Sequence, residues 1–236
     1  MITVSIVSHG HGDMVIALIE QLKKFPLVSQ IILTLNKPEY LEIDKSDEKL
    51  KIVNNGVPLG FGHNHNNAFR FCAKTLFCIL NPDISFSEDP FPELVNVLHD
   101  NRIALVAPLM YSVSGLIEDN ARVFPTSLNI TKKFFLGKEN RWPLDSKNYL
   151  YLPDWVAGMF MLIHAYRFKE YGGFDTRFFM YYEDVDLCRR IRQKGLEVAL
   201  LKSVSVIHSA RRDSRKKFRF FLWHLHSLFR YLFVVK

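Results

Sequence analysis

Residues 76–83 of this chain read Leu76-Phe77-Cys78-Ile79-Leu80-Asn81-Pro82-Asp83. Five apolar residues followed by turn-forming ones predict a short buried strand that stops before the proline. Three similar runs precede it, at residues 3–8, 30–35 and 50–53, and apolar residues at helical spacing separate the first two. This alternation of strand and helix predicts an α/β fold with a mostly parallel central sheet and helices on both faces.

Small or polar residues stand at or just after the carboxyl ends of these strands: Ser8, Asn36, Gly60 and Asp83. Because ligands of open parallel sheets bind beyond these ends, we expect the functional site there. The Gly- and Asn-rich residues 54–67 lead into a helix predicted over residues 68–74 and match neither of the common glycine-rich phosphate loops.

A second informative stretch is acidic. Residues 174–190 read Phe174-Asp175-Thr176-Arg177-Phe178-Phe179-Met180-Tyr181-Tyr182-Glu183-Asp184-Val185-Asp186-Leu187-Cys188-Arg189-Arg190. The carboxylates Glu183, Asp184 and Asp186 crowd beside apolar bulk, so they repel one another and lose water, which makes at least one a candidate general base. The acidic first turn of a helix, which complements the helix dipole, explains the same pattern. The cluster alone leaves both interpretations open.

The chain has 236 residues and a formal net charge of +7, which fits one α/β domain or two small ones. Residues 211–217 form a cationic block that suits phosphate, nucleic acid or an acidic membrane surface, or that is only a solvated tail. The three cysteines lack metal-site spacing, and the N-terminus lacks the features of a signal peptide. No apolar run reaches the length of a spanning helix. These features favour a cytoplasmic protein.

The last predicted helix is basic and amphipathic. Its apolar positions are Phe218, Phe221, Leu222, Leu225, Leu228, Phe229 and Leu232. The opposite side carries Arg219, Trp223, His226 and Arg230. Such a helix can lie in a membrane interface, dock on its own domain or bind a partner, and the pattern favours none of the three. We therefore expect one α/β domain over residues 1–209, irregular over residues 111–152, and a basic amphipathic tail over residues 210–236.

Five segments follow one another in a specific order and spacing. They are Val4-Ser5-Ile6-Val7-Ser8, Pro58 through Asn66, Leu80-Asn81-Pro82-Asp83, Gly172 through Phe179, and Glu183-Asp184-Val185-Asp186-Leu187 with Arg190. Together they resemble the family 2 glycosyltransferases, which have the Rossmann-like GT-A fold. The resemblance runs from Val4 to about Arg212, and it is closest to the rhamnosyltransferase-like enzymes that build bacterial surface polysaccharides such as O-antigen.

The resemblance implies a metal site. Asp83 matches the carboxylate that binds Mg²⁺ or Mn²⁺, and Asn81 stands where other members have the first Asp of an Asp-x-Asp motif. His208 matches a histidine that completes the metal site in some members. A single strand-end carboxylate can hold such a cation when phosphate oxygens and water complete its shell.

The resemblance also implies a base and a donor site. Asp184 matches the catalytic base, which Glu183 and Asp186 would orient or support. The implied nucleotide- and donor-binding residues are Ser8, Asn36, Gly60, Asn66, Asn81, Asp83, Trp155 and Gly158. Many members carry Asp where this chain has Asn36.

These roles imply an inverting glycosyltransferase that uses a nucleotide-diphosphate sugar, dTDP-rhamnose or a UDP-hexose. The expected acceptor is a glycan, linked to polyprenyl pyrophosphate, at the inner face of an anionic membrane where the enzyme is peripheral. One alternative is a sugar nucleotidyltransferase, which releases pyrophosphate instead of a nucleoside diphosphate. A second is a basic nucleic-acid-binding protein, but that leaves the acidic cluster unexplained, so we expect no nucleic-acid partner.

Overall fold

The computed structural model describes residues 1–126, 141–145, 147–209 and 218–234. The cationic block and the start of the predicted tail lie outside these residues. The strands are β1 (Ile2–Ser8), β2 (Val28–Leu35), β3 (Leu50–Asn54), β4 (Leu76–Leu80), β5 (Ile84–Ser85), β6 (Ile103–Ser112), β7 (Ala121–Arg122), β8 (Leu150–Tyr151), β9 (Trp155–Val156), β10 (Phe160–His164) and β11 (Glu197–His208). The helices are α1 (Asp13–Lys23), α2 (Phe61–Phe69), α3 (Phe91–Val97), α5 (Ala165–Glu170), α6 (Glu183–Gln193) and α7 (Phe218–Phe233).

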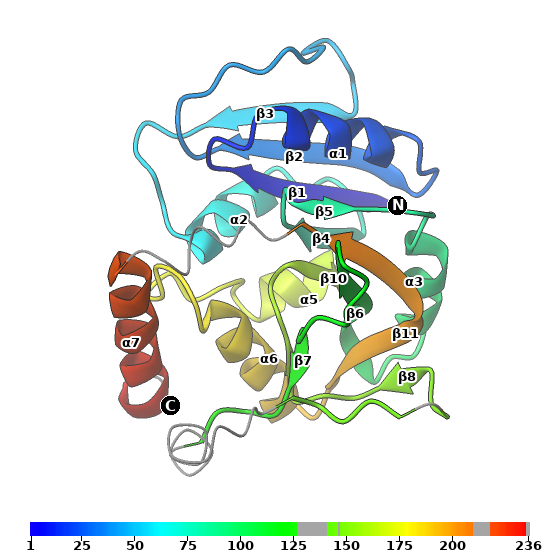
Figure 1. The fold of residues 1–236 in the computed structure, drawn as a ribbon, viewed down its shortest axis with the longest axis vertical. Helices are drawn as coiled ribbons and strands as arrows, with labels where there is room; N and C mark the ends of the chain where they lie inside the picture. The colour runs from blue at the N-terminus through cyan, green and yellow to red at the C-terminus, as the bar shows by residue number, and fades with distance from the viewer. Residues whose placement is uncertain (127–140, 146, 210–217, 235–236) are drawn as a thin grey trace.

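The central sheet has the strand order β3-β2-β1-β4-β10-β6-β11-β5, with β8 also paired to β11 (Figure 1). Parallel pairs join β1 to β2 and β4, β2 to β3, and β6 to β11. Strand β10 runs antiparallel between β4 and β6, while β5 and β8 are antiparallel to β11. The mostly parallel sheet predicted from the sequence is therefore confirmed. Because β10 is reversed, Phe160 at its start lies opposite Leu80 at the end of β4.

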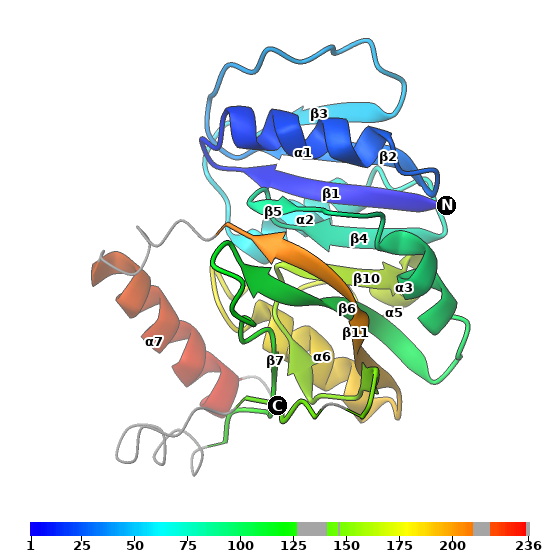
Figure 2. The same cartoon turned by 45° about the vertical axis from the view of Figure 1, so that its right-hand side comes forward.

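The side chains of β4 alternate between two cores, one on each face of the sheet. In β4, Leu76, Cys78 and Leu80 pack into the core that α1 and α3 cover. Phe77 and Ile79 point the other way, into the core built with α5 and α6. The two views of the ribbon show helices on both sides of the sheet (Figures 1 and 2), as the alternation of strand and helix predicted.

Helix α2 begins inside the Gly- and Asn-rich segment rather than after it, which corrects the helix predicted over residues 68–74. Its first turn packs against the segment before α6 too closely for side chains at two positions. A Cβ atom on Gly60 would lie 2.3 Å from the carbonyl oxygen of Phe179, and one on Gly62 would lie 2.6 Å from the Cβ of Phe174. The amide of Phe61 donates to the same Phe179 carbonyl at 3.0 Å. Tertiary packing therefore overrides the low helix propensity of this segment.

Helix α7 packs against its own domain at the side of the molecule, away from the central sheet (Figure 2). Its buried residues are Ser227 and Tyr231, and the ring of Trp223 lies 4.7 Å from that of Phe179. The docked side is thus not the apolar side found by helical spacing. Most of that apolar side is exposed: Phe218, Phe221, Leu222, Leu225 and Phe229. In the described part of the chain, no helix combines the length and apolar character needed to cross a bilayer.

Asn66 ties α2 to the segment before α6, which gives a stability prediction. Its Nδ2 donates to the Phe174 carbonyl at 2.7 Å, and its Oδ1 accepts from the Phe174 amide at 2.9 Å. Asn66→Ala leaves both backbone groups without these partners, so we expect the free energy of unfolding to fall by about 1–3 kcal/mol. The control Asn67→Ala, one position further along the helix, is expected to change it by less than about 0.5 kcal/mol. Urea titration followed by circular dichroism measures both, and equal effects would refute this role of Asn66.

Candidate active site

The carboxyl ends of β1, β2, β4 and β11 lie at one edge of the sheet, because these strands run in the same direction. Ser8, Asn36 and Asp83 stand at or just after the first three ends, and His208 ends β11. The reversed strand β10 begins at this edge, so the residues before it, including Gly158, lie there too. The sheet therefore brings together residues from distant parts of the sequence.

Asp184 reaches this edge through the backbone that precedes β10. The amide of Gly158 donates to Asp184 Oδ2 at 3.0 Å. The carbonyl of the next residue, Met159, accepts from the amide of Asn81 at 2.8 Å. Two consecutive residues thus connect the predicted base to the turn after β4. Asp184 also accepts from the Val185 amide at 2.8 Å, and the residue is half-buried.

The environments of Glu183 and Asp184 separate their pKa values. Burial raises the pKa of Glu183 well above its ordinary value, and the charge of Asp184 raises it further. Burial also raises the pKa of Asp184, but the amides of Gly158 and Val185 and the positive charge of Arg122 oppose that effect. Glu183 therefore holds its proton more strongly than Asp184 does. A carboxylate with a raised pKa is a stronger base than an ordinary one, which suits it to accept a proton.

Asp186 is fully buried and anchors α6. Its carboxylate pairs with Arg189 at 3.0 Å and with Arg190 at 2.8 Å. Arg190 in turn donates to the carbonyls of Gly173, at 2.8 Å, and Tyr171. These bonds fix the chain that enters the acidic segment; the predicted support of the base by Asp186 stays a prediction.

The predicted nucleotide-binding residues hold the loops around the ends of β1 and β2. Asn36 is buried, and its Oδ1 accepts from the Leu59 amide and from Asn55 Nδ2, both at 2.8 Å. Its Nδ2 donates to the Leu59 carbonyl at 2.9 Å. Ser8 Oγ accepts from the His11 amide at 3.2 Å. Asn36 therefore shapes the loop before Gly60, while the Asn66 amide is engaged by the backbone that enters the acidic segment.

Asp83 and His208 lie side by side. His208 Nε2 is 3.3 Å from Asp83 Oδ2, and the other ring nitrogen, Nδ1, is 2.5 Å from Glu118 Oε2. Burial lowers the pKa of His208, but the hydrogen bonds and charges of the two carboxylates outweigh it and raise the pKa. Within the described residues, Asp83 Oδ1 is buried without a hydrogen-bond partner, and no cluster of three or more His, Cys, Asp and Glu side chains has metal-binding spacing.

Arg122 is a charged neighbour of Asp184 that the sequence reasoning missed. Strands β7 and β9 pair so that Arg122 faces Trp155, and the guanidinium carbon lies 5.5 Å from the Trp155 ring centroid. Asp119 holds Arg122 through an ion pair of 2.7 Å, and the Trp155 indole donates to the Val123 carbonyl at 3.0 Å. The one available signal was the i, i+3 pair of opposite charges within a segment interpreted as irregular.

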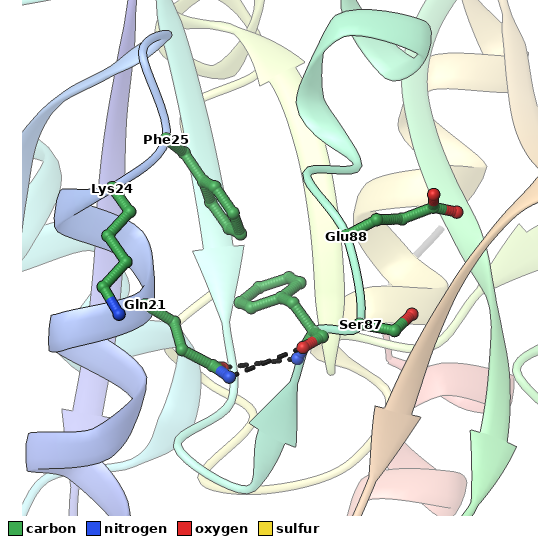
Figure 3. Close-up of a pocket in the computed structure, with 6 residues that line it drawn as sticks. Gln21, Lys24, Phe25, Ser87 and Glu88 are labelled. Atoms are coloured by element: carbon green, nitrogen blue, oxygen red, sulfur yellow. Dashed lines mark hydrogen bonds between the residues drawn. The ribbon is translucent and has the colours of Figure 1, made fainter.

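A hollow elsewhere in the structure is unrelated to these groups. It has a volume of about 180 Å³ and lies between α1 and the segment after β5 (Figure 3). Gln21 pairs with the backbone of Phe86 across it, at 3.3 and 3.4 Å. None of the predicted site residues lines this hollow.

Sequence comparison identifies enzymes that transfer sugars. The chain is 33% identical over 245 residues to the rhamnosyltransferase WbbL of Escherichia coli, a match covering 98% of this chain and 92% of that protein. It is 27% identical over 139 residues to the N-acetylglucosaminyl-diphospho-decaprenol L-rhamnosyltransferase of Mycobacterium tuberculosis, covering 55% of this chain and 45% of that protein. A low-salt glycan biosynthesis hexosyltransferase of Haloferax volcanii is 24% identical over 173 residues, covering 70% of this chain and 53% of that protein. No family model matches the chain.

Structure comparison defines the fold class. GalNAc-T7 with UDP, GalNAc and Mn²⁺ superposes with a TM-score of 0.69 at 16% identity, covering 89% of this chain and 44% of that one. The mannosyltransferase PcManGT of Pyrobaculum calidifontis with GDP-Man and Mn²⁺ gives 0.62 at 13% identity, covering 90% and 58%. The fold is that of the GT-A glycosyltransferases. With a relative one-third identical over nearly its full length, the chain belongs to the rhamnosyltransferase-like family 2 glycosyltransferases, which confirms the resemblance and the enzyme class predicted from sequence.

The electrostatics of Asp184 give a pH prediction. The predicted role of Asp184 as the base requires its ionised form, so its raised pKa would place the acid limb of kcat/KM above the range of an ordinary Asp. Arg122 lowers this pKa, whereas burial favours the protonated form. Arg122→Met therefore raises the pKa further and moves the acid limb to higher pH. Arg141→Met is the control, because Arg141 pairs with the same Asp119, at 3.5 Å, from a more exposed position. A pH–rate profile that is unchanged in Arg122→Met would show that Asp184 does not set the acid limb.

Proposed function

We propose that this glycosyltransferase inverts the anomeric carbon of a nucleotide-diphosphate sugar, dTDP-rhamnose or a UDP-hexose, as it transfers that sugar to a polyprenyl-pyrophosphate-linked glycan. The observation that carries the proposal is the setting of Asp184, a carboxylate of raised pKa that the Gly158 and Val185 amides hold beside the buried Glu183. The rhamnosyltransferase names of two relatives support the donor, and the name of the mycobacterial relative supports the lipid-linked acceptor.

In the proposed reaction Asp184 accepts the proton of an acceptor hydroxyl. The electron pair freed on the acceptor oxygen forms the new bond to the anomeric carbon. The bond from that carbon to the diphosphate oxygen breaks on the opposite side. The nucleoside diphosphate leaves with the electron pair. The Gly158 and Val185 amides hold the carboxylate during this step. Trp155 and Arg122 stand beside it, where an apolar sugar face and an anionic group of the substrate would find partners.

A divalent cation, Mg²⁺ or Mn²⁺, fits the residues at the end of β4. The buried Oδ1 of Asp83 lacks a partner within the described residues, and a carboxylate oxygen in that state is suited to a hard cation. Asp83 and His208 are the residues that would hold the ion, with oxygens of the donor diphosphate completing its shell. Such an ion supplies stabilisation of the negative charge on the leaving diphosphate. The structural neighbours that contain Mn²⁺ support this proposal.

Substitution of the proposed base tests the function directly. We expect Asp184→Asn to bind donor nucleotide normally and to lose transfer by about 100-fold or more, because general base catalysis is removed. Asp83→Asn is the contrasting variant, with weakened Mn²⁺-dependent binding of the nucleotide as its main defect. Transfer from dTDP-rhamnose and UDP-hexoses is followed by release of nucleoside diphosphate, and binding is followed by calorimetry. Wild-type rates in Asp184→Asn would overturn the assignment.

The acceptor proposal also places the enzyme on a membrane surface. The exposed side of α7 is rich in aromatic and aliphatic residues, and the cationic block precedes it in the sequence. A helix with an apolar face inserts at the boundary of headgroups and acyl chains, while nearby basic residues favour anionic lipids. We therefore assign this face to the surface of an anionic bilayer, the side from which a polyprenyl-linked acceptor approaches.

Vesicle binding tests this assignment. We expect Phe221→Ser/Phe229→Ser to weaken sedimentation with vesicles of phosphatidylcholine and phosphatidylglycerol by at least about tenfold, because two apolar side chains no longer insert. Tyr40→Ser is the matched control, because it changes an exposed aromatic residue that is distant from α7 in the sequence. Pure phosphatidylcholine vesicles should bind the wild type more weakly. Equal binding of the double variant and the wild type would refute the membrane assignment.

A further inference from the structure

Two consecutive tyrosines immediately before the acidic cluster have an unusual backbone conformation. Tyr181 and Tyr182 both have a φ angle of 70°, in the left-handed region that residues other than glycine seldom occupy. Such conformations persist only where the surrounding structure fixes them. Tyr182 is also the residue whose carbonyl accepts the first helical hydrogen bond of α6, from the Asp186 amide at 2.9 Å. The conformation of this tyrosine pair therefore sets where α6 begins and where Asp184 points.

Helix α7 supplies part of the surroundings that fix the pair. The ring of His224 lies 5.4 Å from that of Tyr181 and 5.3 Å from that of Tyr182. The ring of Tyr231, two turns further along the helix, lies 5.5 Å from that of Tyr182. Tyr231 also stacks under the guanidinium of Arg189 in α6, at 5.0 Å. One side of α7 thus contacts both the tyrosine pair and the helix that follows it.

The same side of α7 holds the two residues before the pair. Ser227 is buried, and its hydroxyl donates to the carbonyl of Met180 at 2.8 Å. Trp223 packs on Phe179, whose carbonyl is also bound by the first turn of α2. Residues 179–182 are therefore held between α2 on one side and α7 on the other.

We propose that the inner face of α7, formed by Trp223, His224, Ser227 and Tyr231, is a positioning surface for Asp184. Its residues touch no reacting atom. They keep Tyr181 and Tyr182 in the left-handed conformation, which starts α6 at Glu183 and keeps Asp184 within hydrogen-bond distance of Gly158. This inference rests on the role of Asp184 under the proposed function and adds that the C-terminal helix is required for the chemical step.

The kinetic test compares histidines on opposite sides of one helix. Both side chains are exposed, but His224→Ala removes ring contacts with both tyrosines, whereas His226→Ala removes a ring whose Nε2 lies 3.3 Å from a guanidinium nitrogen of Arg230. The assay uses the full chain, dTDP-rhamnose and N-acetylglucosaminyl-diphospho-decaprenol in detergent. A small displacement of a catalytic group lowers the rate of the chemical step strongly. We therefore expect kcat to fall about tenfold in His224→Ala and Tyr231→Ala, with the KM for the donor within about twofold of the wild-type value. His226→Ala should match the wild type, and Tyr231→Phe, which keeps the ring, should restore kcat.

A second readout does not depend on turnover. Hydrogen exchange of the backbone amides of residues 181–187 is expected to be about tenfold faster in His224→Ala and Tyr231→Ala than in His226→Ala, because the tyrosine pair opens more often. Circular dichroism confirms that each variant is folded. If the wild type transfers no sugar, the proposed function is refuted. Faster exchange in His224→Ala and Tyr231→Ala would still support the contact between the positioning surface and the tyrosine pair. Unchanged kcat and unchanged exchange in His224→Ala and Tyr231→Ala would overturn the positioning role.

Discussion

The contact between the first turn of α2 and the aromatic segment before α6 is the constraint on which the site depends. Glycines at positions 60 and 62 let two stretches of backbone approach at distances that any side chain would prevent. The bond from the Phe61 amide to the Phe179 carbonyl closes this contact. Asn66 and Arg190 then fasten the beginning of the same segment to α2 and α6. As a result, an irregular stretch rich in aromatic residues has a defined shape where it meets the acidic cluster.

That shape gives three neighbouring carboxylates three different states. Asp186 is neutralised by two arginines and serves as an anchor. Glu183 is buried without a hydrogen-bond partner at one oxygen, and its pKa is raised well above the ordinary value. Asp184 receives two backbone amides and the positive charge of Arg122, which oppose the effect of burial on its pKa. Because the differences come from burial and partners rather than residue type, a single helical turn contains an anchor, a strongly held proton and the carboxylate proposed as the base.

Much of this fold was predictable from local patterns. The four short apolar runs up to residue 80 and the polar residues after them indicated a parallel sheet with a site at its carboxyl edge, and the structure confirms that sheet. The start of α2 was not predictable, because its Gly- and Asn-rich sequence disfavours a helix until α6 and its preceding segment pack against it. Arg122 was missed for a related reason. Its importance comes from β7 pairing with β9, a contact between segments that sequence periodicity does not connect.

The side on which α7 docks could not be read from its hydrophobic pattern either. The usual rule assigns the apolar side of a helix to the protein interior. Here the docked side contains Trp223, His224, Ser227 and Tyr231, whose rings and hydroxyl match an aromatic surface with an exposed backbone carbonyl. The larger apolar side is left facing outward. The choice depends on the chemistry of the surface being covered, and that surface exists only after the chain has folded.

The order of elements along the chain has a consequence for biosynthesis. Domains begin to fold from the N-terminal side as they are synthesised. The candidate site residues at the carboxyl ends of the strands, from Ser8 to His208, leave the ribosome before α7, the helix that contacts the tyrosine pair. Under the proposed arrangement, a nascent chain that already contains its sugar-nucleotide site is not yet a working transferase. Catalytic competence would then coincide with the appearance of the helix that we assign to the membrane surface, so that sugar transfer would start only in a chain equipped to meet the proposed lipid-linked acceptor.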